Sequence, residues 1–188
     1  NVFFNDVKDI LSSAGFSGQE FHGIPVAYVE RPVNKGTAKS YGGTVRLDAK
    51  FGLSKLDLNS YLAYTFIDGE IDGGHIPFSA KNTIKGGVDF SLNRLSLSPR
   101  FIYRSESYHR SLRDENDNIV TNDPFTLVNL NVRYLISNSD ILKSAVYIKI
   151  INLLNSKYYN LPIGGRECFP NAPQDPIRVN FGLSFKFL

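Results

Sequence analysis

The sequence predicts an all-β protein, an antiparallel β-barrel that crosses a membrane. Apolar and polar side chains alternate over many segments, and a period of two places them on opposite faces of a strand. Short turns alternate with long polar loops along the chain, as they do in transmembrane barrels. The alternating segments are also about nine to twelve residues long, which suits a tilted strand that spans a bilayer.

Composition restricts the other classes of protein. The chain has 188 residues and a net charge of +3, which is too small to indicate a nucleic-acid partner. No run approaches the ~20 apolar residues of a membrane helix, so a helical membrane protein is excluded. The single Cys168 has no internal disulfide partner. Residues 1–10 lack the features of a signal peptide, so we expect any export signal to precede them.

The first part of the chain has the weaker strand signals. Residues 1–10 fit either a strand or a helical turn, and residues 11–23 are predicted as a Gly/Ser-rich loop. Residues 28–51 are predicted as one long bent strand. Within it, Pro32 suits an edge or irregular stretch, and Gly42 with Gly43 indicates a bulge or a close backbone approach.

Regular alternation then predicts six more strands, which makes about eight in all. They lie at residues 56–66, 84–91, 95–104, 128–134, 145–150 and 177–188. The short turns are at residues 52–55, 92–94 and 137–140, and the long loops are at 68–81, 105–124 and 155–176.

The last strand has the clearest pattern. Its polar face carries Arg178, Asn180, Gly182, Ser184 and Lys186, and its apolar face carries Val179, Phe181, Leu183, Phe185 and Phe187. On the apolar faces of other strands, aromatic residues lie at strand ends, where interface girdles belong: Tyr64, Phe66, Tyr103 and Tyr134. A soluble antiparallel sandwich also alternates, so this pattern leaves that class open.

Five segments resemble the C-terminal half of the barrel of TonB-dependent outer-membrane receptors. They are "VNKGTAKSYGGTVRL" (Asn34, Gly36, Ala38 and Gly42 match, with Thr44 where Glu is usual), "SYLAYTFIDGE", "IPFSAKNTIKGGVDF" (Ala80 replaces the usual Pro), "IINLLNSKYY" (Asn152, Leu153, Asn155 and Tyr158 or Tyr159) and "PIRVNFGLSFKF". The resemblance covers nearly the whole chain. One departure is Leu188, where such barrels usually end on an aromatic residue.

This resemblance implies a single domain over residues 1–188 that forms the C-terminal portion of a barrel of about 22 strands. The plug domain, the TonB contact and the other strands are expected on another chain or in a missing segment. The implied function is uptake, across the outer membrane of a Gram-negative bacterium, of a scarce nutrient. A ferric siderophore or other iron chelate is the first expectation, and haem, cobalamin or a glycan are others. The implied partners are TonB, the plug, that small ligand and outer-membrane lipid, with no cofactor and no enzymatic step.

Two alternatives come from other classes of protein. Eight strands can close alone, which would make a small barrel with an adhesive or structural role. The other alternative is a soluble β-sandwich that serves as a binding module.

The candidate ligand site is the charged loop after residue 103. Aromatic and basic groups at a barrel mouth would suit an anionic or ring-bearing ligand, and the alternative is a loop exposed to water or lipopolysaccharide phosphates. The candidates are Arg104, Tyr108, His109, Arg110 and Arg113.

Other polar groups are predicted to have structural roles. His22, His75 and His109 lack metal-ligand spacing, and the acidic stretches at residues 68–72 and 114–118 lack the spacing of a calcium loop. No catalytic set is evident. Charged residues on the polar strand faces would solvate the lumen and pair with a plug; they are Arg46, Asp48, Asp57, Asp89, Arg100, Arg133 and Arg178.

Overall fold

The computed structural model describes residues 1–21, 23–160 and 172–187, and these residues form strands, turns and loops. The strands, in chain order, are β1 (Val2–Phe21), β2 (Ile24–Leu53), β3 (Leu56–Ile71), β4 (Gly74–His75), β5 (Asn82–Leu92), β6 (Leu95–Arg104), β7 (Ser107–Arg113), β8 (Ile119–Asn122), β9 (Phe125–Asn138), β10 (Leu142–Ile151), β11 (Tyr159–Asn160), β12 (Ala172–Pro173) and β13 (Arg178–Phe187). Within the described ranges, no helix is long and apolar enough to cross a membrane.

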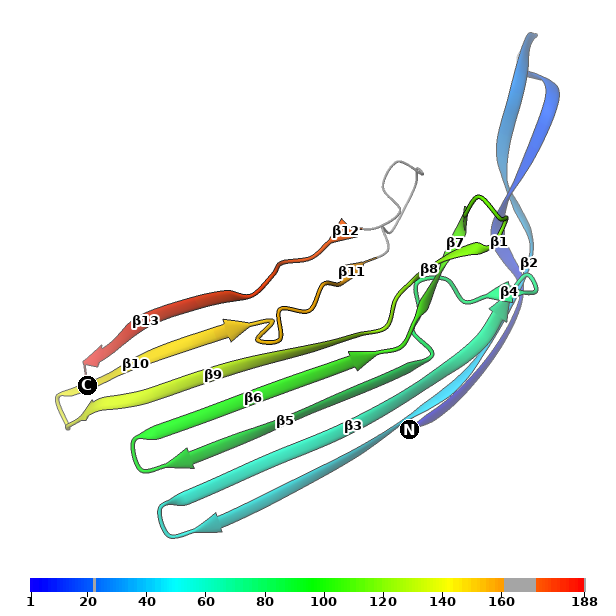
Figure 1. The fold of residues 1–188 in the computed structure, drawn as a ribbon. Coiled ribbons are helices and arrows are strands. Elements are labelled where there is room, and N and C mark those ends of the chain that lie inside the picture. Colours follow the sequence, from blue (N-terminus) through cyan, green and yellow to red (C-terminus); the bar gives the residue numbers. More distant parts are fainter. Residues whose placement is uncertain (22, 161–171, 188) are drawn as a thin grey trace.

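The main sheet is antiparallel and curved (Figure 1). Its order is β1-β2-β3-β5-β6-β9-β10-β13, with β4 added to the end of β3, so the expected eight long strands are confirmed. The β7–β8 and β11–β12 hairpins form two small sheets of their own. Strands β1 and β13 lie at opposite edges and do not pair with each other in the described part of the chain. The fold is therefore a partial barrel.

The strand register lines up apolar side chains across seven strands. Two such rows are Leu53, Leu56, Leu92, Leu95, Tyr134, Val146 and Leu183, and Phe51, Leu58, Phe90, Leu97, Val132, Ile148 and Phe181. These rows follow from the period-two alternation, because antiparallel partners lie on the same face of a sheet.

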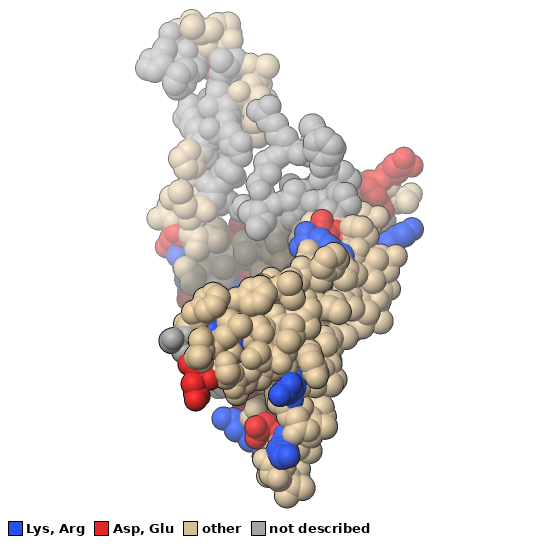
Figure 2. Space-filling view, turned by 90° about the vertical axis from the view of Figure 1, so that its left-hand side faces the viewer, with Lys and Arg blue, Asp and Glu red and all other residues tan. Residues whose placement is uncertain are grey.

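The apolar face is open. Leu47 is 66% exposed and Phe181 is 82% exposed. In the part of the chain that the structure describes, Ala80 and Ala145 are the only buried hydrophobic residues. Figure 2 shows a broad uncharged surface with the charged side chains near its margins. A soluble sandwich would bury this face against a second sheet about 10 Å away, so the sandwich alternative does not fit the fold.

The connections divide between the two ends of the sheet, as expected (Figure 1). The short turns between β2 and β3 and between β5 and β6 each contain one residue with positive φ, Ser54 and Asn93, both at 52°. Such residues suit tight hairpins. The longer connections and the small hairpins gather at the opposite end.

The prediction of a loop at residues 11–23 is wrong. β1 continues to Phe21 and pairs with β2 up to the contact between Phe21 and Ile24, which forms an arm beyond the main sheet (Figure 1). Irregular pairing around Asp9, whose φ is 57°, marks where the register of this hairpin shifts. Backbone pairing maintains these strands although Gly and Ser give them little alternation. Residues 2–10 are likewise strand, with no helical turn.

Two smaller expectations are also corrected. The charged loop at residues 105–124 contains the β7–β8 hairpin, and β3 extends to Ile71 inside the stretch predicted as loop. Gly42 and Gly43 pair without a register shift, so they mark a close approach and form no bulge. A Cβ at Gly42 would collide with the carbonyl oxygen of Phe66.

The open face predicts a difference between two arginine substitutions in the full-length protein. Leu47→Arg on the apolar face should cost about 2–4 kcal/mol near the bilayer midplane, because it places a charge in hydrocarbon. Asn131→Arg on the polar face should cost little. Urea unfolding in lipid vesicles measures both changes, and equal costs would contradict the assignment of the two faces.

Candidate functional site

The predicted ligand residues lie at the end of the sheet that carries the long connections. Arg104 is the last residue of β6 and is paired with Thr83 of β5 and Phe125 of β9. Tyr108 and His109 lie in β7. Arg110 and Arg113 are in the same strand, but their side chains lie outside the described part of the structure.

Tyr108 is held from two sides. Its ring stacks on His75, with centroids 3.9 Å apart and planes 9° from parallel. Its hydroxyl donates a hydrogen bond of 3.0 Å to Oε1 of Glu106. That bond, together with burial, raises the pKa of Tyr108, so its hydroxyl stays protonated at neutral pH.

The rings of His109 and Phe78 meet edge to face, with centroids 5.4 Å apart and an interplanar angle of 80°. The backbones of the two loops also meet: the Phe78 amide donates to the Tyr108 carbonyl at 2.8 Å. Sequence reasoning missed His75 and Phe78 as site residues. Both are in the polar loop at residues 68–81, but nothing local in the sequence indicates that this loop packs against β7.

A polar group supports the base of these loops. Nζ of Lys81 lies 2.5 Å from Oδ2 of Asp68, and the Tyr41 hydroxyl donates to the same oxygen at 3.3 Å. The hydrogen bond from Lys81 and the amide of Gly69 lower the pKa of Asp68, and the carboxylate in turn raises the pKa of Lys81. Lys81 also lies 5.6 Å from the centre of the Phe66 ring. Both groups are therefore charged over the physiological range.

The polar face of the sheet is partly neutralised by its own residues. Arg46 pairs with Asp48 at 2.7 Å, and Arg100 pairs with Asp89 at 2.5 Å. The two guanidinium groups lie 4.7 and 5.7 Å from the centre of the Tyr61 ring. Gly87 makes this arrangement possible, because a Cβ there would collide with Arg100. These ion pairs lie within the sheet itself, whereas the sequence predicted that these residues solvate the lumen and pair with a plug.

The remaining charges of the polar face differ in their partners. Arg178 pairs with Asp175 at 3.0 Å. Within the described residues, Asp57 and Arg133 have no ion-pair partner.

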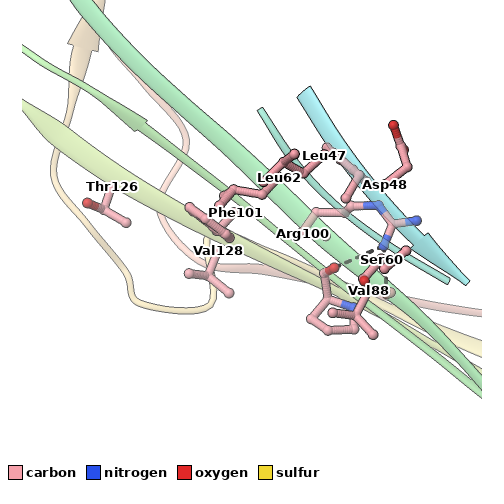
Figure 3. Close-up of a pocket in the computed structure, with 13 residues that line it drawn as sticks. Leu47, Asp48, Ser60, Leu62, Val88, Arg100, Phe101, Thr126 and Val128 are labelled. Atoms are coloured by element: carbon pink, nitrogen blue, oxygen red, sulfur yellow. Dashed lines mark hydrogen bonds between the residues drawn. The ribbon is translucent and has the colours of Figure 1, made fainter. Parts of the chain in front are cut away.

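One depression on the sheet is lined mostly by side chains of the apolar face. It has a volume of about 580 Å³ and crosses β2, β3, β5, β6 and β9 (Figure 3). Leu47, Leu62, Phe101 and Val128 form one of its rows, and the side chain of Arg100 is turned to the Val88 carbonyl, to which it donates at 2.7 Å. The register places this depression on the surface that faces lipid, away from the outer loops.

The "NLLN" segment, which we call the asparagine motif, forms a local network of hydrogen bonds at the end of the sheet that carries the long connections. Asn152 is 1% exposed and has a φ of 53°. Its side-chain amide donates to the carbonyls of Ser156 and Asp175, and its Oδ1 accepts from the Ser156 amide. Asn155 accepts from the amide of Ile177. The motif therefore holds the start of the last strand beside β10.

Among the described residues, no group of three or more His, Cys, Asp or Glu side chains is placed so that it could hold a metal ion. In the acidic stretch at residues 114–118, Asp114 accepts the amides of Asn116 and Asn118 at 2.9 and 2.8 Å, so its carboxylate closes the loop itself. Cys168 and His22 lie outside the described residues.

These features define the class of the protein: a partial antiparallel transmembrane barrel with short turns at one end and elaborate loops at the other. The family described as "TonB dependent receptor-like, beta-barrel" matches residues 1–153, and the chain belongs to that family. Comparison with curated proteins found no match.

Solved structures share the fold. The outer membrane transporter YddB from Escherichia coli aligns with a TM-score of 0.69 and 10% identity over 98% of this chain. BauA, the ferric preacinetobactin receptor from Acinetobacter baumannii, gives 0.66 and 19% over 98%. The ferripyoverdine receptor of Pseudomonas aeruginosa gives 0.66 and 15% over 97%. The chain spans only 29%, 26% and 24% of these three chains, respectively.

The hydrogen bonds of the asparagine motif predict that substitutions at Asn152 lower the free energy of unfolding by different amounts. Asn152→Gly keeps the left-handed backbone but leaves buried groups without partners, which should cost about 1–3 kcal/mol. Asn152→Ala should cost roughly a further 1 kcal/mol, because alanine is strained at positive φ. Asn155→Gly is the matched control at an exposed position and should cost less. Urea unfolding of the full-length protein in vesicles measures the series, and equal costs at positions 152 and 155 would contradict the assigned role.

The Asp68–Lys81 pair predicts a dependence on pH. Because the folded pKa of Asp68 is lowered, the pair's contribution is present above the ordinary carboxyl pKa and is lost as the pH falls through the folded value. The raised pKa of Lys81 sets the other limit, at high pH. The Ile67 amide, which donates to the Lys81 carbonyl, should therefore exchange more slowly than in Asp68→Asn from about pH 5 to about pH 9. Hydrogen exchange at matched pH measures this difference, which should vanish in strong acid.

Proposed function

We propose that residues 1–188 are the C-terminal portion of the barrel of an outer-membrane receptor in a Gram-negative bacterium. The receptor takes up a scarce nutrient, a ferric siderophore or other iron chelate first among them, with energy from TonB. The observation that carries the proposal is the family match over residues 1–153 of a sheet that carries its elaborate loops at one end. No covalent chemistry is part of this function.

The ligand class is supported from two directions. BauA and the P. aeruginosa protein are named as a ferric preacinetobactin receptor and a ferripyoverdine receptor. In this chain, Arg104, Tyr108 and His109 place cationic and aromatic groups at the loop end, and Arg110 and Arg113 follow in β7. Guanidinium groups and aromatic rings suit an anionic chelate with aromatic ligands. These five residues remain our proposed ligand contacts.

The partners of the proposed receptor follow from the partial barrel. In hydrocarbon, the unpaired backbone groups of β1 and β13 require neighbouring strands, and we assign these to the rest of the barrel. A plug against the polar face and TonB acting on that plug complete the proposal, and lipid covers the apolar rows. A small self-contained barrel is less well supported, because the described strands do not close on each other.

Uptake by the full-length receptor tests the proposal. Cells that lack other iron receptors should accumulate 55Fe from a ferric chelate only when both the receptor and TonB are present. Arg104→Ala should weaken chelate binding roughly ten- to a hundredfold, which is the effect of losing a hydrogen bond to a charged group.

The matched control is Arg94→Ala, which removes the same side chain at the short-turn end of the β5–β6 hairpin. It should leave binding unchanged. Equal uptake without TonB, or no binding by any ferric hydroxamate, ferric catecholate or haem, would overturn the proposal.

A further inference from the structure

The loop between β4 and β5 is joined to β7 through the backbone. Pro77 and Tyr108 form a parallel bridge, and the Phe78 amide donates to the Tyr108 carbonyl at 2.8 Å. The segment that leads from β6 into β7 is also bound to the sheet. The Ser105 amide donates to the Asn82 carbonyl at 2.9 Å, and the Ser105 hydroxyl oxygen accepts from the Asn82 amide at 3.0 Å. Two loops about thirty residues apart in sequence thus share hydrogen bonds at two levels.

Side chains reinforce this junction. His75 lies flat against Tyr108 at a centroid distance of 3.9 Å, and Phe78 meets the His109 ring edge to face at 5.4 Å. Both pairs link the same two loops, through two consecutive residues of β7. We call the five residues His75, Pro77, Phe78, Tyr108 and His109 the loop junction.

The position of the junction relates it to the proposed ligand contacts. Tyr108 and His109 are two of those contacts, and each uses one face or edge of its ring on a partner from the other loop. Downstream of Phe78, the loop leads to Lys81, which is fixed by Asp68 at the outer end of β3. The junction therefore connects β7 to a charged anchor on the sheet.

We propose that His75 and Phe78 are positioning residues, which hold Tyr108 and His109 at the outer end of the sheet and make the two loops move as one unit. Coupling of the loops depends only on the junction. Its importance for ligand binding rests on the proposed function. A ligand that contacts β7 would then order the loop that carries His75, although it need not touch that loop.

Hydrogen exchange in the full-length receptor, without ligand, tests the coupling. Tyr108→Ala should speed exchange of the Phe78 amide, and His75→Ala should speed exchange of the β7 amides, each by roughly three- to tenfold, as expected for the loss of an aromatic pair. His75→Phe keeps a ring in the stack and should restore slow exchange. The double variant should show less than the summed effect of the two single variants.

Tyr28→Ala is the matched control, because Tyr28 is an exposed aromatic residue on the β1–β2 arm, 63% exposed and outside the junction. It should leave exchange in both loops unchanged. If each substitution speeds exchange only in its own loop, or if His75→Phe behaves like His75→Ala, the inference is overturned.

Binding of a ferric tris-catecholate complex to the same variants separates the two proposals. Weaker binding to His75→Ala with recovery in His75→Phe would support the positioning role. If the exchange effects cross between the loops and this probe, ferric hydroxamates and haem all fail to bind, the proposed function fails and the coupling stands. If a chelate binds normally to His75→Ala and no effect crosses between the loops, the coupling fails and the proposed function stands.

Discussion

The structure depends on one constraint: in hydrocarbon, every backbone N–H and C=O of a spanning segment needs a partner from the protein. Long antiparallel strands meet this requirement for all but the two edges of the sheet. Because side chains on paired strands share a face, the same ladder aligns the apolar rows from β2 to β13. A shift of register by one residue would turn these rows toward the polar side. Backbone pairing and the lipid-facing surface are therefore set by a single register.

The polar face has to accommodate charge within that register, and two adjacent glycines show how it does so. Gly86 lies under the Phe101 ring on the apolar face, and Gly87 lies under the Arg100 side chain on the other. The flat guanidinium can then reach Asp89, two residues along β5, while remaining near the Tyr61 ring. A larger residue at either position would displace a side chain on only one face. The ion pair between Arg100 and Asp89 thus depends on a small residue at position 87, which leaves the backbone hydrogen bonds of the sheet intact.

Sequence reasoning succeeded where alternation is strong and failed where pairing alone maintains a strand. The long strands β3, β5, β6, β9, β10 and β13 were predictable because lipid on one side and water or protein on the other impose a period of two, whereas the short β7–β8 hairpin was predicted as loop. The arm formed by β1 and β2 was missed at residues 11–23, because it extends beyond the apolar rows. There, no lipid on one side of the strands requires alternating apolar and polar residues. At the candidate site, Tyr108 and His109 could be proposed from their chemistry. Their partners His75 and Phe78 could not, because a contact between two loops leaves no periodic signal.

Differences in mobility between sheet and loops would follow from the same forces. Each long strand of the sheet is held by hydrogen bonds along most of its length, and in a membrane no water competes for them. The outer loops are held by more scattered contacts, among them the ring pairs of His75 and Phe78, the backbone hydrogen bond from Phe78 to Tyr108 and the ion pair of Lys81. A weakly bound ligand can compete with contacts of this strength and cannot reorganise the ladder. Under the proposed function, recognition at this end of the barrel therefore has to act through the loop contacts. The hydrogen bonds of Asn152 to Ser156 and Asp175 oppose movement of the last strand with those loops.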